Sequence, residues 1–157
     1  MLSTNTFAFA VCVHEAGYRW AARRFKIKLR PTRLDRGLRR YAGDVINTDA
    51  DDEAPETLET MAQVMLIGGQ ALSLLAPDYR SGGNDEVEAR SLLWDALELR
   101  HGQGSVKQIP SLLREFNIRI GQLQEEAQNL VAENREKIAQ IADKLLAAMA
   151  VDLTANA

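Results

Sequence analysis

The chain of 157 residues is long enough to form one domain around a hydrophobic core. Its composition, with 46% hydrophobic and 26% charged residues, is typical of a soluble globular protein. The net charge of -3 conceals two segments of opposite sign: residues 19–40 hold ten Lys or Arg and one acid, and residues 44–59 hold seven acids and no base. Such a division is typical either of a polyanion-binding face or of two solvated faces that attract each other across the fold.

A single cysteine, Cys12, excludes an internal disulfide. Its place in an apolar helical pattern indicates a small core residue in a reducing compartment and not a nucleophile. The apolar run at residues 7–13 is too short to cross a bilayer, which takes about 20 residues. No positive charge precedes this run, as one would in a secretory signal. We therefore expect a cytoplasmic protein that does not enter a membrane.

The first predicted element is a helix over residues 4–24, in which apolar side chains recur at helical spacing. His14 and Tyr18 are four positions apart in it and must share one face. Residues 25–30 then alternate strictly between apolar and basic side chains, which predicts a strand with one buried and one positive face. A turn and a returning strand complete a small antiparallel β unit over residues 25–47. The open edge of such a unit can hold an extended peptide.

Three further helices are predicted over residues 55–76, 84–100 and 110–149, the last with a bend near Gly121. In the first of them, Gly68 and Gly69 cost about 1 kcal/mol each relative to alanine, so we expect another backbone to approach closely there. The predicted fold class is therefore mainly α with a small antiparallel β unit (α+β), in a single domain over residues 1–157.

Several stretches, in the same order along the chain, resemble the protease domain of the FtsH-type ATP-dependent zinc metalloproteases. Residues 14–17, His-Glu-Ala-Gly, are similar to the first four positions of that family's His-Glu-Ala-Gly-His zinc helix. Residues 66–71 and 81–85 are similar to its Leu-x-Gly-Gly-Arg-Ala helix and its Thr-Gly-Ala-x-Asn-Asp loop. Residues 130–146 are similar to its closing helix. The ordered set is more specific than any one motif, and it spans most of the chain.

The resemblance implies that His14 and Asp85 match zinc ligands and that Glu15 matches the general base. Zinc with three protein ligands keeps an open position and polarises a peptide carbonyl, and a neighbouring glutamate can take a proton from its water. Tyr18 stands where the family has its second histidine, and a phenol is a poor ligand until it loses its proton. We therefore expect zinc to be substoichiometric or absent, with Tyr18 either a substitute ligand or a space-filling side chain.

The family's ATPase motor has no counterpart in the chain, and the one remaining histidine does not replace the missing ligand within one chain. There is no Gly-x-x-x-x-Gly-Lys-Ser/Thr loop to bind ATP phosphates, so dependence on ATP does not carry over. The only other histidine, His101, lies about 24 Å from Asp85 if both belong to one helix, so these two cannot share a metal within one chain.

Two functions remain in view. The first is an FtsH-type metallopeptidase-like domain without the motor, whose ancestral activity of zinc-dependent peptide-bond hydrolysis is weakened or lost. The second is a non-catalytic module that binds a peptide or partner protein in the same cleft. A polyanion-binding variant ranks lower, because few aromatic side chains interleave with its bases to stack on nucleotides; it would use Arg23, Arg24, Lys26, Lys28, Arg30 and Arg33. Oligomerisation is left open.

Overall fold

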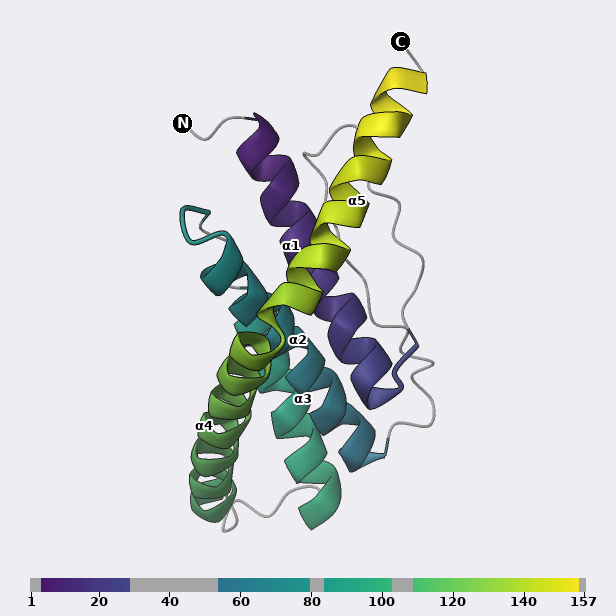
Figure 1. The fold of residues 1–157 in the computed structure, drawn as a ribbon. Helices are drawn as coiled ribbons and strands as arrows, with labels where there is room; N and C mark the ends of the chain where they lie inside the picture. Colours follow the sequence, from purple (N-terminus) through teal and green to yellow (C-terminus); the bar gives the residue numbers. More distant parts are fainter. Residues whose placement is uncertain (1–3, 29–53, 80–83, 103–108, 156–157) are drawn as a thin grey trace.

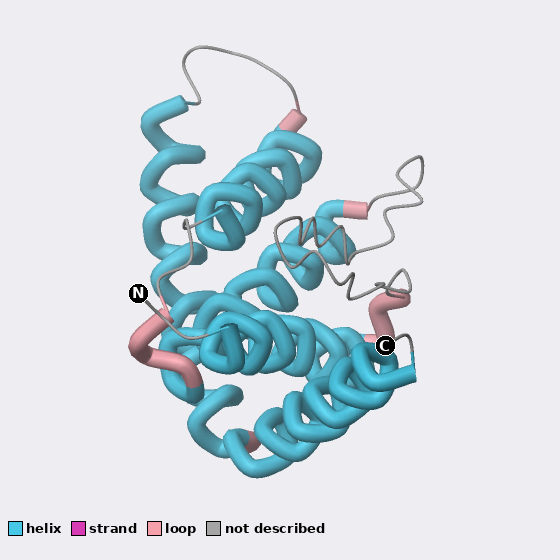
Figure 2. Tube along the Cα trace, turned by 90° about the horizontal axis from the view of Figure 1, so that it is seen from above, coloured by secondary structure: helices cyan, strands magenta, loops and turns pink. Residues whose placement is uncertain are grey.

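The computed structural model describes residues 4–28, 54–79, 84–102 and 109–155. Within these ranges every regular element is a helix (Figures 1 and 2): α1 (Thr4–Phe25), α2 (Pro55–Leu75), α3 (Asn84–His101), α4 (Ile109–Glu133) and α5 (Arg135–Ala155). The ends of α1, α2 and α3 agree with the predicted helices to within one residue.

The predicted α+β class is wrong, because the described residues form helices and no strand. At the start of the predicted β unit, Phe25 is the last residue of α1 and Lys26 takes a left-handed conformation with φ 57°. The N–H of Ile27 then donates to the carbonyl of Ala22 at 2.9 Å, the six-residue bond of a Schellman helix end. Ile27 packs on the core from this position. The alternating pattern therefore marks a helix terminus here, and residues 29–47 of the predicted unit lie outside the described residues.

The prediction of a bend near Gly121 is wrong. The long C-terminal helix breaks at Asn134 instead. Gly121 lies inside α4, and a Cβ added there would meet nothing within 4 Å. The Leu130 carbonyl accepts two hydrogen bonds from Asn134. One comes from the side-chain amide at 2.8 Å and the other from the backbone N–H at 3.1 Å. Local bonds of this kind compete with regular helix geometry. The two helices diverge from this point in Figure 1, and α5 crosses α1 while α4 lies along α2 and α3.

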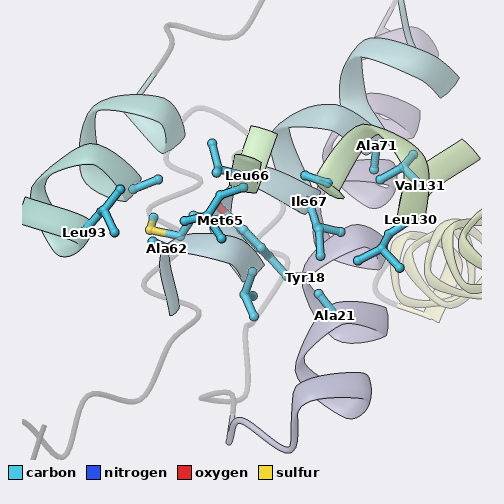
Figure 3. Close-up of a cluster of buried hydrophobic side chains, with 14 of the residues drawn as sticks. Tyr18, Ala21, Ala62, Met65, Leu66, Ile67, Ala71, Leu93, Leu130 and Val131 are labelled. Carbon is cyan, nitrogen blue, oxygen red and sulfur yellow. The ribbon is translucent and has the colours of Figure 1, made fainter. Parts of the chain in front are cut away.

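The centre of the fold is α2, which contacts each of the other four described helices. Fully buried side chains from α2, α3, α4 and α5 meet in one cluster around it, among them Ile67, Leu93, Leu123 and Ile138. Figure 3 shows part of this cluster, with Tyr18 of α1 beside apolar side chains of α2. Burying one such aliphatic side chain stabilises the fold by about 1.5–3 kcal/mol.

By length and composition α2 is also apolar enough to cross a membrane. However, 61% of its most apolar window is buried inside the fold, as in the core helix of a soluble protein.

Candidate functional site

His14, Tyr18 and Asp85 meet above the glycine pair of α2. His14 and Tyr18 lie on one face of α1, and Asp85 lies in the first turn of α3. A Cβ on Gly68 would fall 2.5 Å from Cε1 of Tyr18, and one on Gly69 would fall 3.9 Å from Oδ2 of Asp85. The absence of side chains on α2 therefore leaves room for groups from α1 and α3 to reach each other across it.

At Gly68 two backbones also come together, as predicted for the glycine pair. A Cβ on Gly17 of α1 would lie 3.0 Å from Cα of Gly68 and 2.9 Å from Cβ of Ala71. These distances are shorter than ordinary van der Waals contact, so α1 and α2 cross with their glycines facing each other. The close crossing therefore determines how near His14 and Tyr18 lie to α2.

Both carboxylate oxygens of Asp85 are engaged. Oδ2 contacts Nε2 of His14, and Oδ1 accepts a hydrogen bond from the hydroxyl of Tyr18. The two rings stand edge to face, with 4.4 Å between their centroids and 67° between their planes. His14 and Asp85 stay partly accessible, with 15% and 20% of their side chains exposed, whereas Tyr18 is 2% exposed. The site therefore presents one imidazole and one carboxylate to solvent above a buried phenol.

Glu15, the predicted general base, is buried with 1% of its side chain exposed. Its Oε1 accepts a hydrogen bond from Nε of Arg19 at 3.1 Å, one turn along α1. The carboxylate also influences Cys12: burial, with the negative charge of Glu15 second, raises the pKa of that thiol to about 11, and Arg19 opposes this. The buried thiol agrees with the prediction that Cys12 is a core residue.

Within the part of the chain that the structure describes, these side chains do not complete a catalytic zinc site, which uses three protein ligands. His14 and Asp85 supply two ligand groups of the expected kinds, and the hydroxyl of the third group, Tyr18, donates a hydrogen bond to Asp85. A phenol in that role is not a metal ligand. Among the described residues, no group of three His, Cys, Asp or Glu side chains could hold a metal ion.

The remaining histidine lies elsewhere. His101 is in the last turn of α3, the helix that begins with Asp85 in its first turn. Its Nε2 pairs with Oε2 of Glu115 at 2.8 Å. The prediction that His101 and Asp85 occupy one helix, and so cannot share a metal, agrees with the structure.

The basic residues of the polyanion-binding alternative are only partly described. The side chains of Arg23, Arg24, Lys26 and Lys28 are exposed around the end of α1. Arg24 places its guanidinium 5.7 Å from the centroid of the Trp20 ring. The other two predicted positions, Arg30 and Arg33, lie outside the described residues.

Sequence reasoning missed a second polar cluster, which lies away from His14. Glu59 of α2 pairs with Arg100 of α3 and with Arg119 of α4. Burial alone would raise the pKa of Glu59, but the hydrogen bonds and charges of the two arginines prevail and lower it. No sequence spacing indicates this cluster, because its members come from three helices.

Comparison of the chain with known family models, with curated proteins and with solved structures finds no match.

Proposed function

We propose that this chain is an FtsH-type metallopeptidase-like domain without an ATPase motor, in which the ancestral zinc-dependent hydrolysis of peptide bonds is weakened or lost. One observation carries the proposal: His14 and Asp85, separated by 71 positions, meet side chain to side chain. These are the residues that the resemblance matches to two zinc ligands, and their meeting supports the proposal.

In this proposal, Tyr18 is the reason why the activity is weakened or lost. Its hydroxyl hydrogen-bonds the aspartate, and its ring fills the space over Gly68. A metal at this place would have to break the contact between His14 and Asp85 and would gain no third ligand. The hydrogen-bonded arrangement therefore holds α1 and α3 together where a zinc protease would use the metal.

The second candidate is a non-catalytic module that binds a peptide or partner protein. The burial of Glu15 and its bond to Arg19 favour it. A general base has to come within about 3 Å of the proton that it takes. Glu15 is almost fully buried and bonded to Arg19, whereas His14 and Asp85 remain accessible. Binding without cleavage needs only the accessible pair and the surface around it.

The direct test is metal binding by the unchanged protein and by Tyr18→His. We expect less than one zinc per chain after purification in the unchanged protein. Tyr18→His should approach one zinc per chain, with at least a tenfold lower dissociation constant, because it supplies the third nitrogen or oxygen ligand. Metal content by mass spectrometry and zinc titration by calorimetry measure both quantities.

Tyr18→Phe is the matched control, because it removes the hydroxyl without adding a ligand and should not gain zinc. Full zinc occupancy in the unchanged protein would contradict the role given to Tyr18. A folded Tyr18→His that gains no zinc would contradict the peptidase-like origin. If the zinc-loaded Tyr18→His protein cleaves an unstructured peptide, adding Glu15→Gln should abolish that cleavage.

A further inference from the structure

The bend between α4 and α5 occupies a single residue, Asn134. Hydrogen bonds of the α-helical kind continue on both sides of it. The backbone N–H of Asn134 donates to the Leu130 carbonyl at 3.1 Å, and its carbonyl accepts from the N–H of Ile138 at 3.1 Å. Both bonds span four residues, as in an uninterrupted helix. Little of the backbone therefore has to change for α4 and α5 to become one straight helix.

The sequence around the bend favours a continuous helix. Residues 122–157 hold neither proline nor glycine, which are common causes of a sharp bend. Glu133 and Arg135, on either side of Asn134, are good helix formers. The side-chain amide of Asn134 donates to the Leu130 carbonyl, and a bond of this kind competes with regular helix geometry. The bend therefore opposes the local preference, and one side chain and the tertiary contacts of α5 maintain it.

The tertiary contacts of α5 lie mainly on α1. Among the described helices, α5 packs most extensively on α1, and its contact with α4 is slight. Figure 1 shows α5 crossing α1 after it diverges from α4. Ile138 and Ala142 of α5 are fully buried in the shared core, so α5 has to stay covered by apolar side chains. The surface on α1 that receives α5 would accept the identical helix of a second copy with the same contacts.

We propose that two copies of this chain exchange α5, forming a dimer in which α4 and α5 of each chain join into one straight helix. Each α5 lies on α1 of the other chain, so the same surfaces meet twice around a two-fold axis. The dimer keeps the packing of α5 on α1 and removes the bend at Asn134. Loss of the bend favours the dimer and the entropy of association opposes it, so its share depends on protein concentration. The exchange does not involve His14 or Asp85, so the inference does not rest on the proposed function.

The first test is size-exclusion chromatography with light scattering, after refolding from guanidinium at several protein concentrations. We expect a dimer whose share rises with the protein concentration during refolding. Once formed, it should persist for hours after dilution, because reversal has to release α5 from the core. Asn134→Ala should raise the association constant at least tenfold and Asn134→Gly should lower it at least tenfold, because alanine favours a continuous helix and glycine opposes it.

Asn129→Ala is the matched control. It makes the same change at an exposed position of α4, five residues before the bend. This position is helical in the monomer and in the dimer, so the association constant should not change. An equal effect of Asn129→Ala and Asn134→Ala would show that the bend does not govern association.

Pulsed electron paramagnetic resonance identifies the straight helix directly. Spin labels on Arg114→Cys and Lys144→Cys, both at exposed positions, lie about 45 Å apart along a straight helix at 1.5 Å per residue. The label spares Cys12, because burial raises the pKa of its thiol to about 11. An excess of unlabelled chain leaves only the distance within one chain. We expect about 45 Å in the dimer and a shorter distance in the monomer.

A chain that stays monomeric at every concentration, both unchanged and as Asn134→Ala, would overturn the proposal. A dimer that dissociates at once on dilution, keeps the shorter distance and does not respond to Asn134→Gly would overturn it as well. Such a dimer would form through exposed apolar side chains of α4, such as Leu113 and Ile118. Should Asn134→Ala fail to fold, the unchanged chain and Asn134→Gly decide between these outcomes.

Discussion

At the scale of single residues, Tyr18 shows how a side chain can keep the geometry of a site and change its chemistry. It occupies the place one turn after His14 and reaches the carboxylate that the imidazole also contacts. The phenol satisfies that carboxylate with a proton where a second imidazole would have shared a metal with it. The geometry follows from the i, i+4 spacing, and the chemistry follows from the type of residue.

Cys12 gives a prediction at the same scale. Its thiol is fully buried, and a pKa of about 11 in place of 9.0 leaves about a hundredfold less thiolate at pH 8. Because the thiolate is the nucleophile, iodoacetamide should modify the folded protein at least a hundredfold more slowly than the chain unfolded in guanidinium. Mass spectrometry of timed samples measures both rates. Equal rates would show that Cys12 is not the core residue described above.

At the scale of the elements, the crossing of α1 and α2 depends on glycines that face each other. Gly17 and Gly68 allow the two backbones to approach, and the missing side chain of Gly68 leaves room for the ring of Tyr18. A larger side chain at the crossing would separate the helices or displace the tyrosine ring, and the contact of Tyr18 with Asp85 would be lost with it.

Gly68→Ala should therefore destabilise the protein, although alanine favours a helix. Its Cβ would lie 2.5 Å from a ring carbon of Tyr18, and overpacking of this kind costs about 1–3 kcal/mol. Gly121→Ala is the matched control on α4, because its Cβ meets nothing within 4 Å and should stabilise by about 0.5–1 kcal/mol. Urea unfolding followed by circular dichroism measures both changes. A stabilised Gly68→Ala would show that α1 and α2 do not cross closely.

At the scale of the whole molecule, α2 is the helix on which the others assemble, and Glu59 ties it to α3 and α4 at one end. The Glu59 side chain is 12% exposed, so its two arginine partners are held near the edge of the core. The pairs link elements far apart in sequence and so contribute to the arrangement of the helices, not to any one of them.

This cluster predicts a dependence of stability on pH. The pKa of Glu59 is lower in the folded protein than its ordinary value of 4.5, so the folded state prefers the ionised form. Its contribution to stability is complete above pH 4.5 and is lost as the pH falls through the lowered pKa. Glu59→Gln should therefore be less stable than the unchanged chain at pH 7, with a smaller difference near pH 3.

Urea midpoints at several pH values test this. Glu125→Gln is the control, because it removes an exposed carboxylate of α4 and should change neither the midpoint at pH 7 nor its pH dependence appreciably. A difference between Glu59→Gln and the unchanged chain that stays constant from pH 7 to pH 3 would exclude ionised Glu59 as the stabilising species.

The sequence by itself determined the first three described helices and one contact between them. Apolar spacing and Pro55 at a first helical position set the limits of α1, α2 and α3, because these signals are local. The cost of two glycines in mid-helix correctly indicated a close approach. The meeting of His14 and Asp85 followed from the resemblance to a family, since no spacing rule connects positions on two different helices.

Only the tertiary structure decided what depends on distant partners. Alternation over residues 25–30 has the period of a strand, yet Ile27 serves as the apolar residue after a helix end, because the core offers it a place there. The two arginines on Glu59 and the unpaired amide of Gln63 likewise arise from where helices pack. Local sequence patterns predict the conformation of the backbone. Which side chains contact each other is decided only when separate helices pack together.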